Sequence, residues 1–300
     1  MSAHKNYVRA ALLALIAFTG WVFGDVGLKL AREANVPQGE IMLISGISGM
    51  SAVLVLSALR GKLSYLRPAR WDGLAAIGLC QLVAFVSWIV ALPYLPLANM
   101  YVVAFLMPMT VACLAALFLK EHLGWKRGLS IAVGFVGVII AVNPGGLIAK
   151  GGAWWPYLVV FANMVGSAVQ MFLLRLVANK ERSESTSFYP RIVMILVGLG
   201  WCLTSGFAPL SFKLFFAVAA QGILGGLGWA LMAEAYRNAP AASVAPFQYS
   251  QIIAGALFGY MIWNDRPDMH LFAGAAVIVM SGLYLVRHER RMSRVMVRAQ

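Results

Sequence analysis

Charged side chains are rare inside the long apolar segments of this 300-residue chain, so those that occur there are the first candidates for chemistry. Asp25 and Lys29 lie four residues apart in one such segment, which places them on one face of a helix. They could neutralise each other near a membrane surface, or form a gate or a site for a zwitterion. Because a charge within a bilayer costs at least about 2.5–3.5 kcal/mol, both are candidate gating or coupling residues.

A third charged candidate, Glu234, lies near the end of another apolar segment, close to Arg237. Such a position is typical of an anchor or an inner gate lock at the membrane surface. A role in coupling is the alternative interpretation. Glu234 therefore joins Asp25 and Lys29 as a gating or coupling candidate.

Amide, hydroxyl and aromatic side chains inside the apolar segments form a larger set, because a buried amide needs a hydrogen-bond partner. Each could satisfy a neighbouring helix instead of a ligand. Asn163, Ser167 and Gln170 share one helix face, which favours a face turned toward a water-filled cavity. The candidate substrate-binding residues are Trp21, Gln81, Trp88, Tyr101, Asn163, Ser167, Gln170, Trp229, Gln248 and Tyr249, with Gln251 close by.

Enzymatic chemistry is not indicated by the sequence. The four histidines lie at segment ends or in tails, so no Ser–His pair is expected inside the membrane. Asp25 has no second intramembrane aspartate with which to form a dyad. The chain contains neither a Walker A sequence nor cysteines spaced for a metal site. We therefore expect no catalytic residue, no metal and no cofactor.

Membrane-spanning helices are the elements expected to position these residues. Apolar residues make up 61% of the chain and charged residues 12%, which is too little charge for the surface of a soluble protein. A bilayer-crossing helix needs about 20 mostly apolar residues. The sequence predicts ten spans, at residues 8–30, 41–59, 73–92, 97–119, 128–147, 154–174, 192–212, 214–233, 239–263 and 270–286.

The positive charges predict how the ten spans are oriented. With a cytoplasmic N-terminus, all but five of the 24 Lys and Arg residues fall on the cytoplasmic side. Both termini are therefore expected in the cytoplasm, and the net charge of +13 needs no nucleic-acid partner. The expected partners are the lipid bilayer and a small-molecule substrate, with the chain a monomer or a homodimer.

A sparse internal repeat divides the chain into residues 1–150 and 151–300. An offset of 144 residues aligns Pro96 with Pro240 and Glu121 with Asp265. Since each half holds an odd number of spans, the second copy must be inverted. The predicted fold is an all-α membrane protein made of two inverted five-helix repeats, an architecture typical of secondary transporters with alternating access.

Proline and glycine add local expectations to this fold. Pro108 and Pro246 are expected to interrupt the fourth and ninth spans. Gly-x-x-x-Gly pairs that begin at Gly20, Gly222 and Gly255 predict close helix contacts.

The chain resembles the drug/metabolite transporter superfamily, in its EamA-type exporter branch. The resemblance rests on the five-plus-five duplication, on the acidic residue that closes the fourth span in Phe118-Leu119-Lys120-Glu121, and on the glycine-rich fifth span. Asn264-Asp265-Arg266-Pro267 departs from the pattern, because a Gly-Glu pair is usual there.

The resemblance implies export of amino acids or other small metabolites across the bacterial inner membrane. The length and aromatic content are similar to those of the aromatic-amino-acid exporters of this branch. A channel, or a transporter for another small solute such as a drug, a purine or a sugar phosphate, is the alternative. An intramembrane enzyme is disfavoured.

Overall fold

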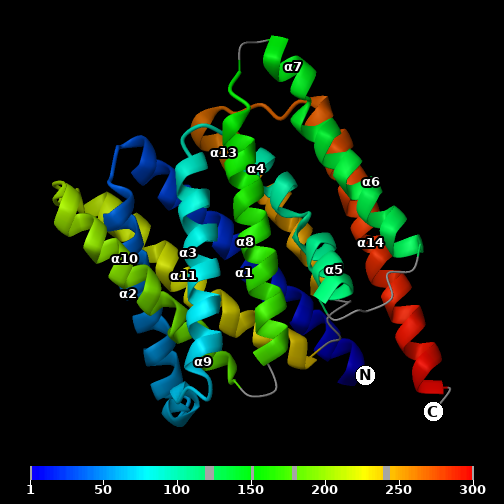
Figure 1. The fold of residues 1–300 in the computed structure, drawn as a ribbon, viewed down its shortest axis with the longest axis horizontal. Coiled ribbons are helices and arrows are strands. Elements are labelled where there is room, and N and C mark those ends of the chain that lie inside the picture. Colours follow the sequence, from blue (N-terminus) through cyan, green and yellow to red (C-terminus); the bar gives the residue numbers. More distant parts are fainter. Residues whose placement is uncertain (1, 119–124, 150–151, 178–180, 239–243, 299–300) are drawn as a thin grey trace.

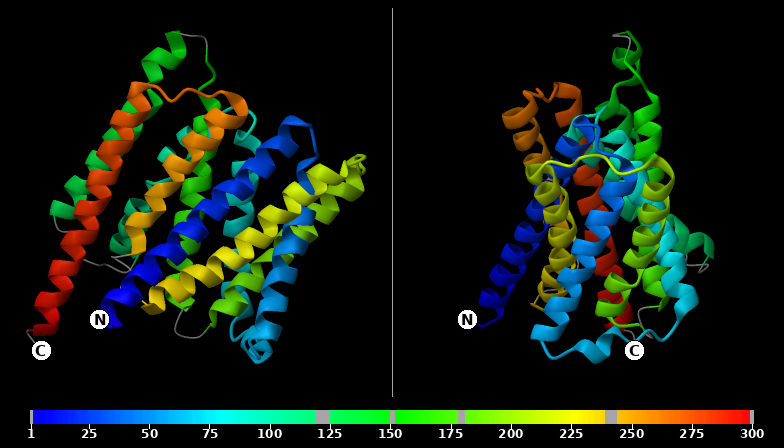
Figure 2. Two further views of the ribbon diagram at one scale, coloured as in Figure 1. Left: turned by 180° about the vertical axis from the view of Figure 1, so that it is seen from behind. Right: turned by 90° about the vertical axis from the view of Figure 1, so that its left-hand side faces the viewer.

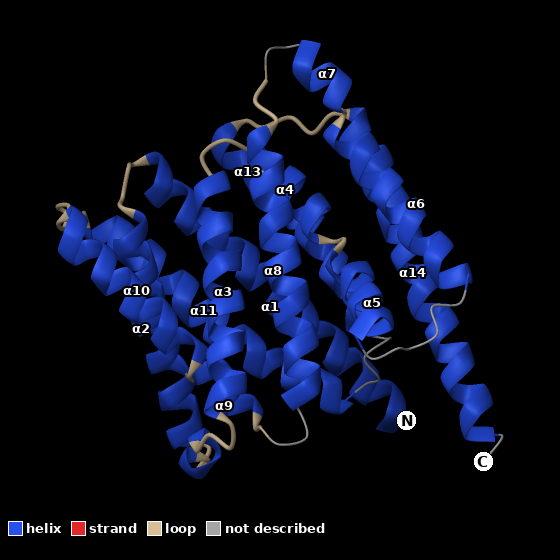
Figure 3. Cartoon of the chain, viewed as in Figure 1, coloured by secondary structure: helices blue, strands red, loops and turns tan. Residues whose placement is uncertain are grey.

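A computed structural model of the protein describes residues 2–118, 125–149, 152–177, 181–238 and 244–298. Within these ranges the chain forms helices joined by short connections, with no strand (Figure 3). Helix α1 begins and helix α14 ends at the same end of the bundle (Figure 1). Glu121 and Pro240, which the repeat alignment used, lie outside the described residues.

The elements follow one another along the chain in two series. The first series is α1 (Ser2–Glu33), α2 (Gln38–Leu59), the 3₁₀ helix η1 (Leu63–Leu66), α3 (Trp71–Ala91), α4 (Leu97–Ala104), α5 (Met107–Phe118), α6 (Trp125–Val142) and α7 (Pro144–Ala149). The second is α8 (Trp155–Val177), α9 (Ser183–Phe188), α10 (Pro190–Ser205), α11 (Phe212–Asn238), the 3₁₀ helix η2 (Ala245–Tyr249), α13 (Ser250–Trp263) and α14 (Met269–Arg298).

Eight helical stretches of the described chain are long and apolar enough to cross a bilayer, and they overlap the first eight predicted spans. The ninth predicted span, 239–263, begins outside the described residues and continues as η2 and α13. The tenth corresponds to the shorter apolar stretch Met269–Tyr284 of α14. The protein is therefore an all-α membrane protein.

The predicted boundaries of the seventh span, 192–212, are wrong at both ends. The helical stretch begins at Ser183, where α9 leads almost directly into α10. It ends at Ser205 because Gly206 adopts a positive φ of 82°, which terminates a helix. Pro209 lies in the connection that follows.

The helices pack mainly in antiparallel or crossing pairs. Helix α1 packs along α11, α3 along α8, and α2 against both α10 and α11. Helices α6 and α14 form a pair at one edge of the bundle (Figures 1 and 2). Glycines permit these close contacts: a Cβ atom at Gly222 would overlap Ser45 and Ser48 of α2, and one at Gly274 would overlap the backbone of α6.

The fourth predicted span, 97–119, is two helices rather than one. Residues Phe105 and Leu106 separate α4 from α5, two residues before Pro108. Proline cannot donate a backbone hydrogen bond, so the helical ladder stops at this point. The expected interruption near Pro246 takes the form of the 3₁₀ helix η2, which precedes α13. The rings of Phe105 and Tyr249, one at each junction, lie 5.3 Å apart.

Candidate functional site

A cavity of about 410 Å³ lies among α1, α4, α5, α8, α11 and the η2–α13 junction. It occupies the half of the bundle nearer the start of α1, because α8 and α11 contribute residues close to their C-terminal ends. The residues that line it carry no formal charge: Phe18, Trp21, Tyr101, Ala104, Phe105, Met107, Ser167, Gln170, Met171, Leu174, Trp229, Met232, Gln248 and Gln251.

Aromatic rings form the α1–α11 side of this cavity. The ring centroids of Trp21 and Trp229 lie 5.7 Å apart with an interplanar angle of 53°, and Phe18 meets Trp21 edge to face. Trp21 lies against Gly228, where any added Cβ atom would overlap the indole. The two tryptophans therefore provide a fixed apolar surface for a flat ligand.

A row of rings extends from α3 to η2 on another side of the cavity. Trp88 lies 5.4 Å from Tyr101, Tyr101 lies 6.4 Å from Phe105, and Phe105 meets Tyr249 edge to face. Tyr101 fits against α13 because Gly255 has no side chain there. The row joins the cavity wall to the deeper core of the bundle.

Four polar side chains face the cavity without a protein partner. Ser167, Gln170, Gln248 and Gln251 make no side-chain hydrogen bond to any described residue. Asn163, one turn before Ser167, instead donates a hydrogen bond of 2.8 Å from Nδ2 to the carbonyl oxygen of Ala84. The hydroxyl and the three amides are therefore free to bind a ligand, whereas Asn163 joins α8 to α3.

Six of the ten predicted binding residues are brought together in the cavity wall: Trp21, Tyr101, Ser167, Gln170, Trp229 and Gln248. The structure places the other four outside the lining. Asn163 bonds to α3, Trp88 and Tyr249 pack behind the wall, and Gln81 takes no part in it.

Several residues of the wall were missed by the sequence prediction, and all are apolar. Met171 and Leu174 continue the face of Ser167 and Gln170 at a helical spacing, and that periodicity could have revealed them. Phe105 and Met107 flank the α4–α5 break, which the position of Pro108 signals. Nothing local distinguishes Phe18 or Met232 from residues that face lipid.

Asp25 and Lys29 do not form the ion pair that their spacing permitted. The Asp25 carboxylate accepts a hydrogen bond of 2.5 Å from the Tyr101 hydroxyl, in the middle of the bundle. Lys29 Nζ lies 3.5 Å from Asp265 Oδ2 and donates to the carbonyl oxygen of Leu95. Each residue therefore has a partner from a different part of the chain.

The neighbourhood of Lys29 forms a charged cluster at the end of the bundle opposite the start of α1. Lys29 Nζ lies 4.4 Å above the ring of Trp263, whose Nε1 donates a 2.6 Å hydrogen bond to Glu33. A second cavity, of about 360 Å³, lies beside it and includes Asp265, Arg266 and Asp268 in its lining. We call the residues Lys29, Asp265, Trp263 and Glu33 the Lys29 cluster.

Glu234 lies near the C-terminal end of α11. Its Oε1 atom is 3.3 Å from Nη2 of Arg9 and accepts a hydrogen bond from Asn238. The side chain of Arg237 lies outside the description. The Arg9–Glu234 pair joins the first helix to α11 in a partly exposed position, which suits an anchor or lock.

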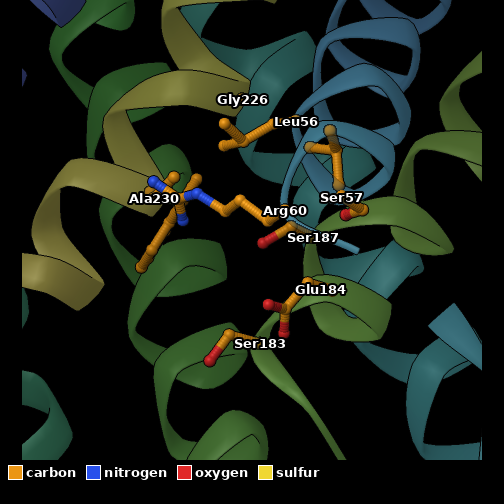
Figure 4. A pocket seen from close by; sticks show the side chains of 10 residues that line it. Leu56, Ser57, Arg60, Ser183, Glu184, Ser187, Gly226 and Ala230 are labelled. Atoms are coloured by element: carbon orange, nitrogen blue, oxygen red, sulfur yellow. The ribbon is translucent and has the colours of Figure 1, made fainter. Parts of the chain in front are cut away.

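A smaller hollow of about 50 Å³ lies between the ends of α2, α9 and α11. Figure 4 shows Arg60 extending from α2 toward Ala230, with Ser183, Glu184 and Ser187 of α9 nearby. Trp229 lines both this hollow and the 410 Å³ cavity, so α11 separates them. The hollow is too small for a metabolite, and the free amides and facing rings make the 410 Å³ cavity the candidate site.

The model of the EamA-like transporter family matches residues 8–143 and, a second time, residues 154–287. The chain belongs to this family. It is therefore a small-molecule transporter of the drug/metabolite superfamily and a multi-pass membrane protein, rather than an enzyme.

Curated relatives of this EamA-like protein are named for different solutes. The S-adenosylmethionine uptake transporter of Rickettsia bellii is 27% identical over 218 residues, covering 71% of this chain and 72% of its own. The riboflavin transporter of Rhizobium johnstonii is 26% identical, covering 69% and 68%. The pseudopaline exporter CntI of Pseudomonas aeruginosa is 24% identical, covering 95% and 98%.

A solved crystal structure also aligns with this EamA-like chain. It covers 94% of this chain and 98% of its own, with a TM-score of 0.67 and 18% sequence identity. The likeness shows a shared fold.

Proposed function

We propose that this EamA-like transporter exports amino acids, the aromatic ones included. The direction is from the bacterial cytoplasm across the inner membrane. The observation that carries the proposal is the 410 Å³ cavity, in which unpartnered amides face aromatic rings. Amides can bind the carboxylate and ammonium groups of a zwitterion by hydrogen bonding, and the tryptophans can contact an apolar or aromatic side chain.

The uncharged lining favours a substrate with a flat apolar part over a sugar phosphate. A phosphate in a bilayer would need fixed cations, which the lining of the described cavity does not provide. The named solutes of two relatives, riboflavin and S-adenosylmethionine, both contain a flat ring system. They are therefore the main competitors of aromatic amino acids for this site.

Alternating access between two inverted repeats is the transport mechanism that we propose. Two features support it: α1 packs along α11 as α8 packs along α3, and the offset of 144 residues relates Phe105 to Tyr249. The rings of these two residues meet at the junctions that interrupt the fourth and ninth predicted spans. A pseudo-two-fold axis between them would exchange the halves, with both termini in the cytoplasm.

Counterflow in proteoliposomes tests the proposal without assuming a driving force. Vesicles are loaded with unlabelled tryptophan, leucine, riboflavin or S-adenosylmethionine, and uptake of the same labelled solute is measured. We expect saturable counterflow of tryptophan. Gln170→Leu should weaken its apparent affinity by at least about tenfold, since one lost hydrogen bond to a charged group costs about 1.5–3 kcal/mol. Gln81→Leu removes an amide outside the cavity and should have no effect.

Two results would contradict this proposal. Flux that rises linearly with concentration would indicate a channel. Saturable counterflow of riboflavin or S-adenosylmethionine alone would retain the transporter and the cavity but replace the substrate class.

A further inference from the structure

Asp25 is a carboxylate in the membrane-spanning part of α1 that has no cationic partner. Among the described residues, no Lys, Arg or His nitrogen lies within ion-pair distance of it. Lys29, one turn further along the same helix, is held by Asp265 and the carbonyl oxygen of Leu95. A carboxylate in this position is costly, and such groups commonly belong to proton pathways.

Tyr101 connects this carboxylate to the substrate cavity. Its hydroxyl donates the 2.5 Å hydrogen bond to Asp25 Oδ2, and its side chain lines the 410 Å³ cavity. The indole N–H of Trp88, beside the Tyr101 ring, is buried and also faces the Asp25 carboxylate. Asp25 is itself only partly buried. The carboxylate is therefore hydrogen-bonded to a residue of the cavity wall.

The other titratable groups near α1 are engaged elsewhere or lie at a distance. On α11, which packs along α1, the described charged residues Lys213 and Glu234 lie close to the helix ends. From η2, Tyr249 is separated from Tyr101 by the Phe105 ring. On α2, the carboxylate of Glu40 accepts the backbone N–H of Ala208.

The neighbours of α1 beyond Tyr101 add no further charge at Asp25. The residue of α11 that faces Gly24 is the neutral Gln221, and the α3 residue beside Tyr101 is Trp88. Beyond the end of α13, Asp265 is paired with Lys29. Asp25 is thus the carboxylate of this region that is bonded to a residue of the cavity wall.

We propose that Asp25 is a proton-binding site that couples substrate export to proton entry, with Tyr101 as the positioning residue between carboxylate and cavity. This proposal rests on the proposed transport function. When the carboxylate is ionised, it accepts the Tyr101 hydroxyl hydrogen bond and holds the ring in the cavity wall, where it contacts substrate. A proton taken up from the outer side bonds to a carboxylate oxygen, the Tyr101 hydroxyl is released, and substrate leaves. The same proton departs to the cytoplasm before the next substrate binds.

Proton-driven transport measured beside counterflow tests this proposal. The probe solute is tryptophan, with riboflavin and S-adenosylmethionine in parallel, in proteoliposomes with and without an imposed pH gradient. We expect the gradient to drive accumulation against the proton flow in the wild type. Asp25→Asn should retain counterflow but lose gradient-driven accumulation. Asp72→Asn, which changes an exposed carboxylate bonded to Arg70, is the matched control and should keep both.

Proton release gives an independent measurement on the purified protein in weakly buffered detergent. Adding the transported probe solute should release protons from the wild type and from Asp72→Asn, but not from Asp25→Asn. Tyr101→Phe should shift the pH dependence of this release while Asp25 remains, as expected of a positioning residue. Where Asp25→Asn does not fold, Asp25→Glu takes its place and should keep coupling with an altered pH dependence.

The outcomes separate the two proposals. Wild-type counterflow without gradient-driven accumulation or proton release would overturn the role of Asp25 and leave the transport function standing. Gradient-driven accumulation that survives in Asp25→Asn would also overturn it. Absence of counterflow for every probe solute would contradict the proposed function itself.

Discussion

The two cavities of the molecule are similar in volume, about 410 and 360 Å³, and opposite in chemistry. The first is lined by rings and amides without a formal charge. The second lies beside the Lys29 cluster, where α1 is joined to the loop after α13 by an ion pair, and to Trp263 through Glu33. The neutral cavity leaves its amides free, whereas beside the charged cavity Lys29 is paired with Asp265 and Glu33 is bonded to Trp263.

This difference assigns separate roles to the two ends of α1. Groups without protein partners are available to a ligand, so the neutral cavity suits binding. Paired groups that come from both halves of the chain hold these halves together, so the Lys29 cluster suits closure.

The largest expected effect comes from breaking the Lys29 cluster. Lys29→Ala removes the ion pair to Asp265, the contact with the Trp263 ring and the hydrogen bond to Leu95. We expect a loss of about 2–3 kcal/mol of stability, because Lys29 is buried and its partners lose charged contacts. Thermal unfolding in detergent measures it. Lys213→Ala, at an exposed lysine, should be neutral. Equal melting temperatures for Lys29→Ala and the wild type would show that the Lys29 cluster does not stabilise the fold.

A smaller effect is expected from enlarging a glycine behind the neutral cavity. A Cβ atom at Gly228 would overlap the Trp21 indole. Gly228→Ala should therefore cost about 1–2 kcal/mol from overpacking. It should also displace Trp21 and weaken counterflow of large solutes more than that of small ones. Gly200→Ala is the control, because a Cβ atom there meets open space. If Gly228→Ala leaves the preference between large and small solutes unchanged, Trp21 does not contact the substrate.

Removing one ring from the neutral cavity should act on binding rather than on folding. Trp229→Ala is expected to weaken the apparent affinity for tryptophan by several-fold, since an aromatic contact contributes about 0.5–1.5 kcal/mol. Leucine should be affected less. Trp201→Ala, on the outer surface of α10, provides the matched control in the same counterflow assay. Equal losses for both solutes would argue against ring stacking.

The smallest effect is expected at the Arg9–Glu234 ion pair. Arg9→Gln breaks the contact with Glu234, but the Arg9 side chain is 63% exposed. Solvent-exposed pairs contribute less than about 1 kcal/mol, so thermal unfolding should barely change. If Arg9→Gln destabilises the protein as much as Lys29→Ala does, the contacts at the two ends of α1 contribute equally to stability.

Much of the fold could be predicted because hydropathy and proline act locally. The first eight predicted spans overlap helices, and Pro108 signals the break between α4 and α5. The end of α10 was misplaced because the charge of Lys213 was taken to divide the two spans, whereas the positive φ of Gly206 ends the helix earlier.

The site was predicted only in part, because its polar members stand out against an apolar background and its apolar members do not. Gln170 and Gln248 were recognisable, while Met232 has the same character as a lipid-facing residue. The true partner of Lys29 is Asp265, far away in the sequence, and no local spacing points to it. Asp25 was found, but its bond to Tyr101 depends on how α1 and α4 pack.

Two aromatic side chains at the cavity rest on glycines of other helices: Trp21 on Gly228, and Tyr249, behind the wall, on Gly282 of α14. A substrate never meets these glycines. The absence of a side chain at these glycines nevertheless sets how far each ring can move away from the cavity. It thereby sets how large a substrate the cavity can hold. Substrate range can thus diverge between relatives through backbone positions one layer outside the site, while the contacting residues stay the same. A survey of specificity limited to residues that touch the ligand would overlook that route.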